Sequence, residues 1–245
     1  MKHTYNKRIK TFLILCTVAI SMFSANEKLL IYNAYLTNDM KTWKNIIEKI
    51  NVENGKSNER NLELLNYEYG YIGWCLGTKN KKEAKIYIDK GEKRIETLVK
   101  NKYKLSVIYA YKSAFNGYQI ALNKSKAPFY GGKSVKDAEK SLQLDPSNYF
   151  GYIQLGNIDY FKPPLFGGSK KNAMIFYQKA EKLMMGTDVK NDWNYLSLLT
   201  QIAKGYEELE DDKNAEIYYK KALSFAPNFT WVKNELYPKF LKNKK

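Results

Sequence analysis

Histidine is almost missing from this sequence. The only histidine of the 245-residue chain is His3, which precedes an apolar run. Catalytic triads, many zinc sites and acid–base chemistry near neutral pH use histidine. The rest of the chain therefore lacks the side chain on which these functions depend. No other arrangement of residues indicates a catalytic centre, a metal site or a bound cofactor, and we expect a protein that is not an enzyme.

Cysteine is scarce too. The chain has two cysteines, Cys16 and Cys75, and only Cys75 lies beyond the first 25 residues. A chain shortened to those later residues therefore cannot form an intrachain disulfide. The neighbours of Cys75, in "YGYIGWCLG", are apolar and aromatic. This setting predicts a buried structural thiol, because a reactive cysteine needs an exposed and electropositive one.

Arginine contributes little to the strongly basic charge. The formal net charge is +16, yet only Arg8, Arg60 and Arg94 are arginine. The many lysines are interleaved with glutamates, a pattern typical of solvated helix faces. Recognition of phosphates and bases favours the planar fork of arginine. We therefore expect no nucleic-acid partner.

The first 25 residues read as an export signal. Four positive charges, at Lys2, Lys7, Arg8 and Lys10, precede an apolar run at 12–23, and the small residues Ser24 and Ala25 follow. The run is short for a membrane span, which favours a signal peptide over residues 1–25 or an uncleaved anchor. We expect an exported protein, located in the periplasm or envelope, with no membrane contact beyond this segment.

The clearest internal repeat lies at residues 196–229. Large, small and aromatic residues follow a fixed spacing over two helical segments, and a proline ends the unit. The small residues let two antiparallel helices approach closely, the tyrosines fill the gap, and the second helix cannot continue through the proline. These positions are Leu199, Ala203, Tyr206, Ala215, Tyr219, Ala222 and Pro227.

A second copy spans residues 149–185. Its corresponding positions are Tyr152, Leu155, Gly156, Ala173, Tyr177 and Ala180. Gly156 and Ala173 are 17 residues apart, against 12 for the equivalent pair of the last repeat, so five residues are inserted at "KPPLFGGS". We predict that the prolines stop the first helix, that the glycines provide the turn and that Ser169 caps the next helix.

The upstream chain carries looser copies. We interpret "APFYGGKS", residues 127–134, as a turn with a helix cap, and Gly117 as the small residue where the helices of that unit cross. Residues 59–100 and 26–50 read as two further helical hairpins, and the C-terminal stretch as a capping helix. The prediction is one all-α domain over residues 26–245, a right-handed superhelical solenoid of antiparallel helix pairs with a C-terminal capping helix.

These motifs resemble the tetratricopeptide repeat (TPR). The extended "PPLFGG" loop is similar to that of exported repeat proteins of Bacteroidetes-type bacteria, and the Gly-Gly pairs are faintly similar to the TPR component of tripartite ATP-independent periplasmic transporters. The resemblance implies a concave face that binds a protein, a peptide or a small ligand. The first function that we expect is therefore a non-enzymatic exported scaffold that binds a protein or peptide partner in the cell envelope.

The alternative is a periplasmic solute-binding or transport-accessory protein with a small-ligand pocket near the Gly-Gly loops. Candidate residues follow for both functions. The first helix of each repeat lines the concave groove in this architecture, and its polar residues there are Gln154, Asn157, Gln201 and Lys204. The loop aromatics Phe129, Tyr130 and Phe166 are candidates for the lip of a pocket.

Overall fold

The computed structural model describes residues 26–243. The predicted signal or anchor at 1–25 and the last two residues, 244–245, lie outside the described part. Within it every regular element is helical, and no helix combines the length and the hydropathy that a membrane span needs. The helices share one hydrophobic core.

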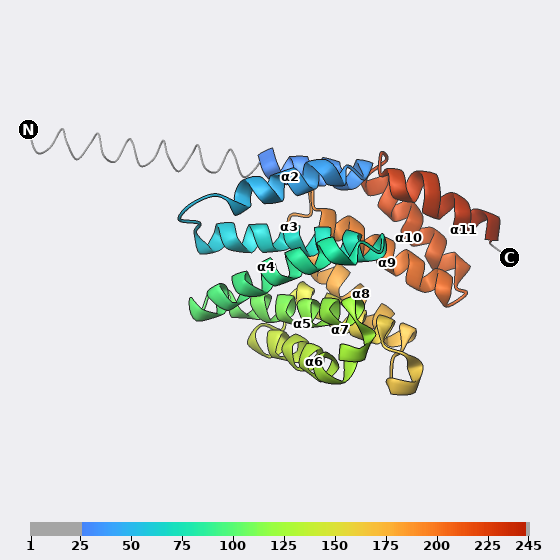
Figure 1. The fold of residues 1–245 in the computed structure, drawn as a ribbon. Helices are drawn as coiled ribbons and strands as arrows, with labels where there is room; N and C mark the ends of the chain where they lie inside the picture. The colour runs from blue at the N-terminus through green and yellow to red at the C-terminus, as the bar shows by residue number, and fades with distance from the viewer. Residues whose placement is uncertain (1–25, 244–245) are drawn as a thin grey trace, which may run out of the picture.

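Consecutive helices pair as antiparallel hairpins (Figure 1). The pairs are residues 26–37 with α2 (Met40–Asn51), α3 (Asn58–Gly77) with α4 (Lys81–Lys100), α5 (Leu105–Leu122) with α6 (Ala127–Leu144), α7 (Tyr149–Phe161) with α8 (Lys170–Met184), and α9 (Trp193–Glu208) with α10 (Asp212–Phe225). A π-helical turn, Val232–Leu236, and α11 (Tyr237–Asn243) follow α10. The predicted all-α, TPR-like solenoid is confirmed.

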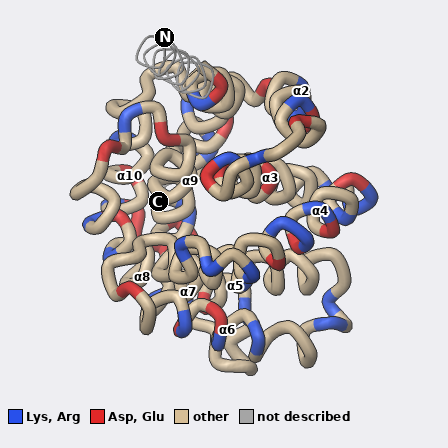
Figure 2. The backbone as a smooth tube through the Cα atoms, turned by 90° about the vertical axis from the view of Figure 1, so that its left-hand side faces the viewer, with Lys and Arg blue, Asp and Glu red and all other residues tan. Residues whose placement is uncertain are grey.

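The hairpins are arranged in two layers. Figure 2 looks along the helices and shows α3, α5, α7 and α9 on the inside, with α2, α4, α6, α8 and α10 outside them. Helix α3 packs against α5, and α5 packs against α7. The α7–α8 hairpin contacts α9 mainly through α8, and the Tyr160 hydroxyl of α7 donates to Glu208 of α9. We call α3, α5, α7 and α9 the inner helices. Basic and acidic residues alternate along the tube, as the sequence predicts for solvated helix faces.

Close approach within a hairpin depends on small residues. A Cβ atom at Gly156 of α7 would lie 2.4 Å from the ring of Tyr177 in α8, so no larger residue fits there without movement. The alanines at 173, 180, 203, 215 and 222 and the tyrosines at 177 and 219 are fully buried. Tyr152, Leu155 and Tyr206 are half-buried, and Pro227 stands exposed just after α10. The spacing read from the sequence thus coincides with the helix contacts.

The connection between α7 and α8 follows the sequence motif. Helix α7 ends at Phe161, directly before Lys162 and the two prolines. Gly167 adopts φ of +86°, a conformation that favours glycine, and the Ser169 side chain accepts a hydrogen bond from the Asn172 N–H. The prolines, the glycine and the cap therefore fix how the chain enters α8.

The predicted turn at residues 127–134 is wrong. Helix α6 begins at Ala127 and runs through Gly131 and Gly132, with a short 3-10 turn, Lys124–Lys126, before it. Gly117 is not the crossing residue either, because a Cβ there would meet nothing within 4 Å. The helices cross instead at Ser113 and Ser134, whose hydroxyls lie 3.1 Å apart. A pair of glycines looks like a turn in sequence, but packing of α6 on α5 holds it helical.

The first and last hairpins meet, so the array closes on itself. Trp43 of α2 and Trp193 of α9 contact edge to face with ring centroids 5.0 Å apart. A Cβ atom at Gly70 of α3 would lie 2.6 Å from the first ring and 2.7 Å from the second. The Thr230 hydroxyl also donates to the Leu36 carbonyl at 2.8 Å. These contacts join segments that lie far apart in the sequence.

The register of the α7–α8 hairpin predicts the result of a substitution. Gly156→Leu forces a side chain into the Tyr177 ring and should lower the free energy of unfolding by about 1–3 kcal/mol or more, as measured by urea denaturation. The matched control is Gly131→Ala in α6, where a Cβ meets nothing within 4 Å. This control should stabilise the protein by up to about 1 kcal/mol, because alanine is the better helix former. Equal effects of the two variants would contradict the register.

Candidate functional site

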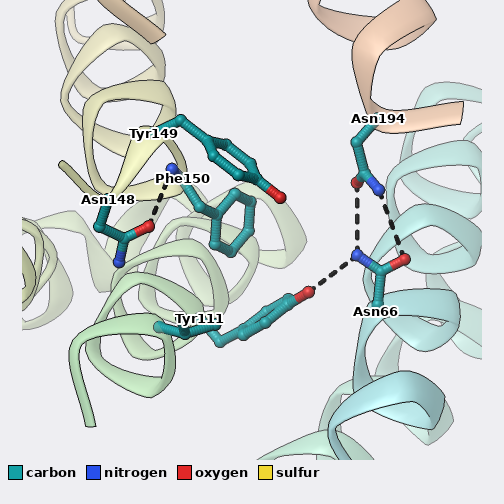
Figure 3. A pocket seen from close by; sticks show the side chains of 7 residues that line it. Asn66, Tyr111, Asn148, Tyr149, Phe150 and Asn194 are labelled. Carbon is teal, nitrogen blue, oxygen red and sulfur yellow. Dashed lines mark hydrogen bonds between the residues drawn. The ribbon is translucent and has the colours of Figure 1, made fainter. Parts of the chain in front are cut away.

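A small pocket lies where the inner helices converge (Figure 3). Its walls come from α3, α5, α7, α9 and the residue that caps α7. They are formed by Asn66, Val107, Tyr111, Asn148, Tyr149, Phe150 and Asn194. The free volume is about 80 Å³. This suffices for a few waters or one small side chain, and is well below the roughly 300 Å³ at which pockets begin to enclose drug-sized ligands.

Asn66 links three inner helices across this pocket. Its amide nitrogen donates to the Tyr111 hydroxyl of α5 at 2.9 Å, and its amide oxygen accepts from the Trp193 indole N–H of α9 at 3.1 Å. Longer contacts of 3.4 and 3.5 Å join it to the amide of Asn194. Figure 3 shows Asn66 and Asn194 facing each other on one side of the pocket. One side chain thus sets the spacing of the pocket walls.

Asn148 forms the opposite wall and begins α7. Its side-chain oxygen accepts from the Phe150 N–H at 3.0 Å, as a helix cap does. Its amide nitrogen donates to the hydroxyls of Ser106 and Ser141, at 2.8 and 2.9 Å. The cap is only 6% exposed, so these bonds hold the start of α7 rigidly against α5 and α6.

Two phenols give the pocket its hydrogen-bonding character. In Figure 3 the Tyr149 hydroxyl points into the space between the walls. Burial raises the pKa of Tyr149 to about 12, and the Asp192 carboxylate adds to this rise. Burial also raises the pKa of Tyr111, although the Asn66 amide opposes the shift. Both phenols therefore stay neutral at physiological pH and can donate or accept hydrogen bonds.

The chemistry of the pocket is that of recognition. Its polar groups are amides and neutral phenols, which bind carbonyls, amides and hydroxyls. Its lining pairs no nucleophile with a base. Across residues 26–243, no group of three or more His, Cys, Asp or Glu side chains is placed to hold a metal ion.

The polar residues predicted to line an open groove differ in exposure: Gln154 is buried, and Asn157, Gln201 and Lys204 are half-buried. Gln154 is 2% exposed, so the prediction that it faces an open groove is wrong. Asn157 donates to the Gln154 side-chain oxygen at 3.2 Å and accepts from the Tyr177 hydroxyl at 2.8 Å. The amide nitrogens of Gln154 and Gln201 are buried and make no hydrogen bond within the described residues. The closed array thus narrows this part of the concave face.

Lys204 and the loop aromatics lie elsewhere. The Lys204 ammonium is 5.8 Å from the ring of Trp231, so it faces the C-terminal cap. Phe129, in the first turn of α6, is 61% exposed, and Phe166, on the connection before α8, is 70% exposed. Tyr130 packs edge to face on Phe129. None of these three aromatics lines either of the two best-formed pockets of the described chain. Their binding role stays a prediction.

Sequence reasoning missed the pocket residues. Asn66 stands in the middle of a helix, between Leu65 and Tyr67, where asparagine is a poor helix former. An asparagine inside a helix could therefore have indicated a buried polar contact. Asn148 and Asn194 could not, because both resemble ordinary helix-capping residues. Their convergence depends on the closure of the array.

Comparisons with known proteins agree with this architecture. Residues 196–229 match the family of the tetratricopeptide repeat. A search of curated proteins gives no significant match. Among solved structures, the HusA haemophore from Porphyromonas gingivalis is similar, with a TM-score of 0.62 and 16% identity over 77% of this chain and 93% of that one. TTC0263, a thermophilic TPR protein in Thermus thermophilus, has a TM-score of 0.54 and 16% identity, and the match covers 92% of this chain and 96% of that one.

At such low identities the structural likeness defines the fold alone. The repeat match covers residues 196–229, and the fold of the described residues is an all-α, TPR-like helical repeat. TPR repeats build scaffolds that generally bind other proteins, and their extended surfaces suit this role. The resemblance inferred from the repeat motifs is confirmed at this level.

The central role of Asn66 is testable by mutation. Asn66→Ala removes the partner of the Trp193 indole N–H and of the Tyr111 hydroxyl at once. We expect the free energy of unfolding to fall by about 1–3 kcal/mol in urea denaturation. The control, Asn101→Ala, removes an exposed bond to Asn58 and should change stability by less than about 0.5 kcal/mol. A loss for Asn66→Ala no larger than that of the control would show that Asn66 does not join the helices.

Proposed function

We propose that this protein is a non-enzymatic, exported helical-repeat scaffold that binds a polypeptide partner in the cell envelope. The partner docks at the pocket between the inner helices. The observation that carries the proposal is the set of asparagine amides and neutral phenols that four helices bring to one small, half-enclosed space. The repeat match supports partner binding, and the sequence of residues 1–25 supports export.

The chemistry of the pocket favours a polypeptide. The amide N–H groups of Asn66 and Asn148 are bonded within the protein, whereas the Tyr149 hydroxyl points into the free space and can pair with a peptide group. A volume of about 80 Å³ accepts one side chain or one chain end, the usual size of an anchor in peptide recognition. Tyr149 and Phe150 add aromatic surface for the apolar part of such an anchor. The rest of the contact would lie on the neighbouring helix surfaces.

The second candidate is a small-ligand carrier that uses the same pocket. The aromatic lining and the likeness to a structure described as a haemophore favour it. It ranks below the first because the free volume is far smaller than a porphyrin. The pocket between the inner helices also lies away from the Gly-Gly segments, where a ligand lip is expected from the sequence.

Filling the pocket tests the proposal. Val107 lines the pocket and is partly buried, so Val107→Phe should occupy the space without removing a hydrogen bond. Peptides selected from a random displayed library on the wild-type protein should bind this variant at least about tenfold more weakly, a loss of about 1.4 kcal/mol. Affinities are measured by fluorescence anisotropy with the selected peptides.

The matched control is Val52→Phe, on a valine that is 76% exposed and does not line the pocket. It should bind the selected peptides as the wild type does. Failure to select any peptide, or selected peptides that bind both variants equally, would count against the docking site. Saturable haem binding that Val107→Phe abolishes, without peptide selection, would establish the small-ligand alternative in its place.

A further inference from the structure

Two connections between helices share one edge of the molecule. Because the helices alternate in direction, the ends of α5 and α7 and the starts of α6 and α8 all lie on the same side. Figure 1 shows both connections at the lower right. They belong to consecutive hairpins, whose packed helices lie roughly 10 Å apart. One flat surface can therefore touch both connections at once.

Large apolar side chains project from this edge. Phe129 is 61% exposed, Phe161 70%, Leu165 88% and Phe166 70%. Folded proteins expose single apolar residues routinely, but a group of this size on neighbouring turns marks a contact surface. These side chains stand at the ends of helices and on the connection between α7 and α8, so they suit insertion into a lipid surface better than capture of a partner in a groove.

Basic charge accompanies the apolar side chains. Residues 122–136 and 160–171 contain no Asp or Glu. Their lysines are Lys124, Lys126, Lys133, Lys136, Lys162, Lys170 and Lys171. Among these, only Lys170 forms an ion pair with a described residue, Glu208, and this pair marks the boundary with the acidic turn between α9 and α10. Asp137 and Asp159 flank these ranges and interact electrostatically with Lys136 and Lys162, so the excess positive charge comes mainly from the other lysines.

Lysine and aromatic side chains lie together at the start of α6. The Lys133 ammonium is 3.5 Å from the centroid of the Phe129 ring and 5.7 Å from that of Tyr130, and the Lys126 ammonium is 5.8 Å from the Tyr130 ring. Such pairs place an apolar ring and a positive charge at the same depth, which matches the boundary between phospholipid headgroups and acyl chains. We define residues 122–136 and 160–171 as the lysine–phenylalanine edge.

We propose that the lysine–phenylalanine edge binds the surface of an anionic phospholipid bilayer. Phe129, Leu165 and Phe166 insert at the interface, and the lysines are attracted to the anionic headgroups. This surface differs from the expectation of no membrane contact beyond residues 1–25. It is also separate from the pocket between the inner helices, so the proposal does not rest on the proposed function.

Vesicle co-sedimentation tests the proposal. Residues 26–245 are used, so that the apolar run at 12–23 does not contribute. The protein should bind vesicles that contain phosphatidylglycerol, bind pure phosphatidylcholine vesicles at least about tenfold more weakly, and dissociate as salt rises. The triple variant Phe129→Ser, Leu165→Ser, Phe166→Ser should bind the anionic vesicles at least about tenfold more weakly. All three residues are exposed, so this variant should keep its melting temperature.

Control variants distinguish binding through the lysine–phenylalanine edge from nonspecific binding through any exposed apolar or basic side chain. Val52→Ser with Met185→Ser removes apolar side chains that are 76% and 61% exposed at the opposite edge, and should bind as the wild type does. Lys133→Gln with Lys162→Gln should weaken anionic binding, whereas Lys100→Gln with Lys140→Gln should weaken it less. Equal binding to neutral and anionic vesicles, equal losses in the two apolar variants, or binding to duplex DNA or an acidic polypeptide without vesicle binding would overturn the proposal.

Discussion

The edge-to-face contact of Trp43 and Trp193 over Gly70 holds the two ends of the array together. The ring centroids are 5.0 Å apart, and Gly70 leaves no room for a Cβ between the rings. Aromatic pairs of this geometry add stabilisation beyond the apolar area that they bury. In a solenoid each repeat normally contacts only its neighbours, so a contact between α2 and α9 changes the molecule from an open array to a closed one.

The closure explains where polar groups lie. It brings Asn66 of α3 to the start of α9, and the pocket forms in the space that the amides and phenols enclose. It also narrows the concave face that an open array would offer, where Gln154 is buried and Asn157 is half-buried against Tyr177. The small pocket and the connections at the edges remain accessible to partners.

The sequence specifies the local structure well. The close helix contact at Gly156, the helix end before Pro163 and the helix cap at Ser169 depend on neighbours within one hairpin. All three could therefore be predicted from the sequence. The helix through Gly131 and Gly132 could not, because packing on α5 overrides their poor helix propensity. The pocket could not be predicted from the sequence for a related reason. Asn66 and Asn194 are 128 residues apart, and no local pattern says that the array closes.

Closure itself is the central claim, and nuclear Overhauser contacts in labelled protein test it most directly. The indole protons of Trp43 and Trp193 should show cross-peaks to each other and to the Gly70 Hα, because these groups touch. Contacts between the Tyr177 ring and Gly156 provide an internal reference within one hairpin. Observation of both sets would support a closed array. The reference contacts without the tryptophan contacts would show an open solenoid and contradict the account.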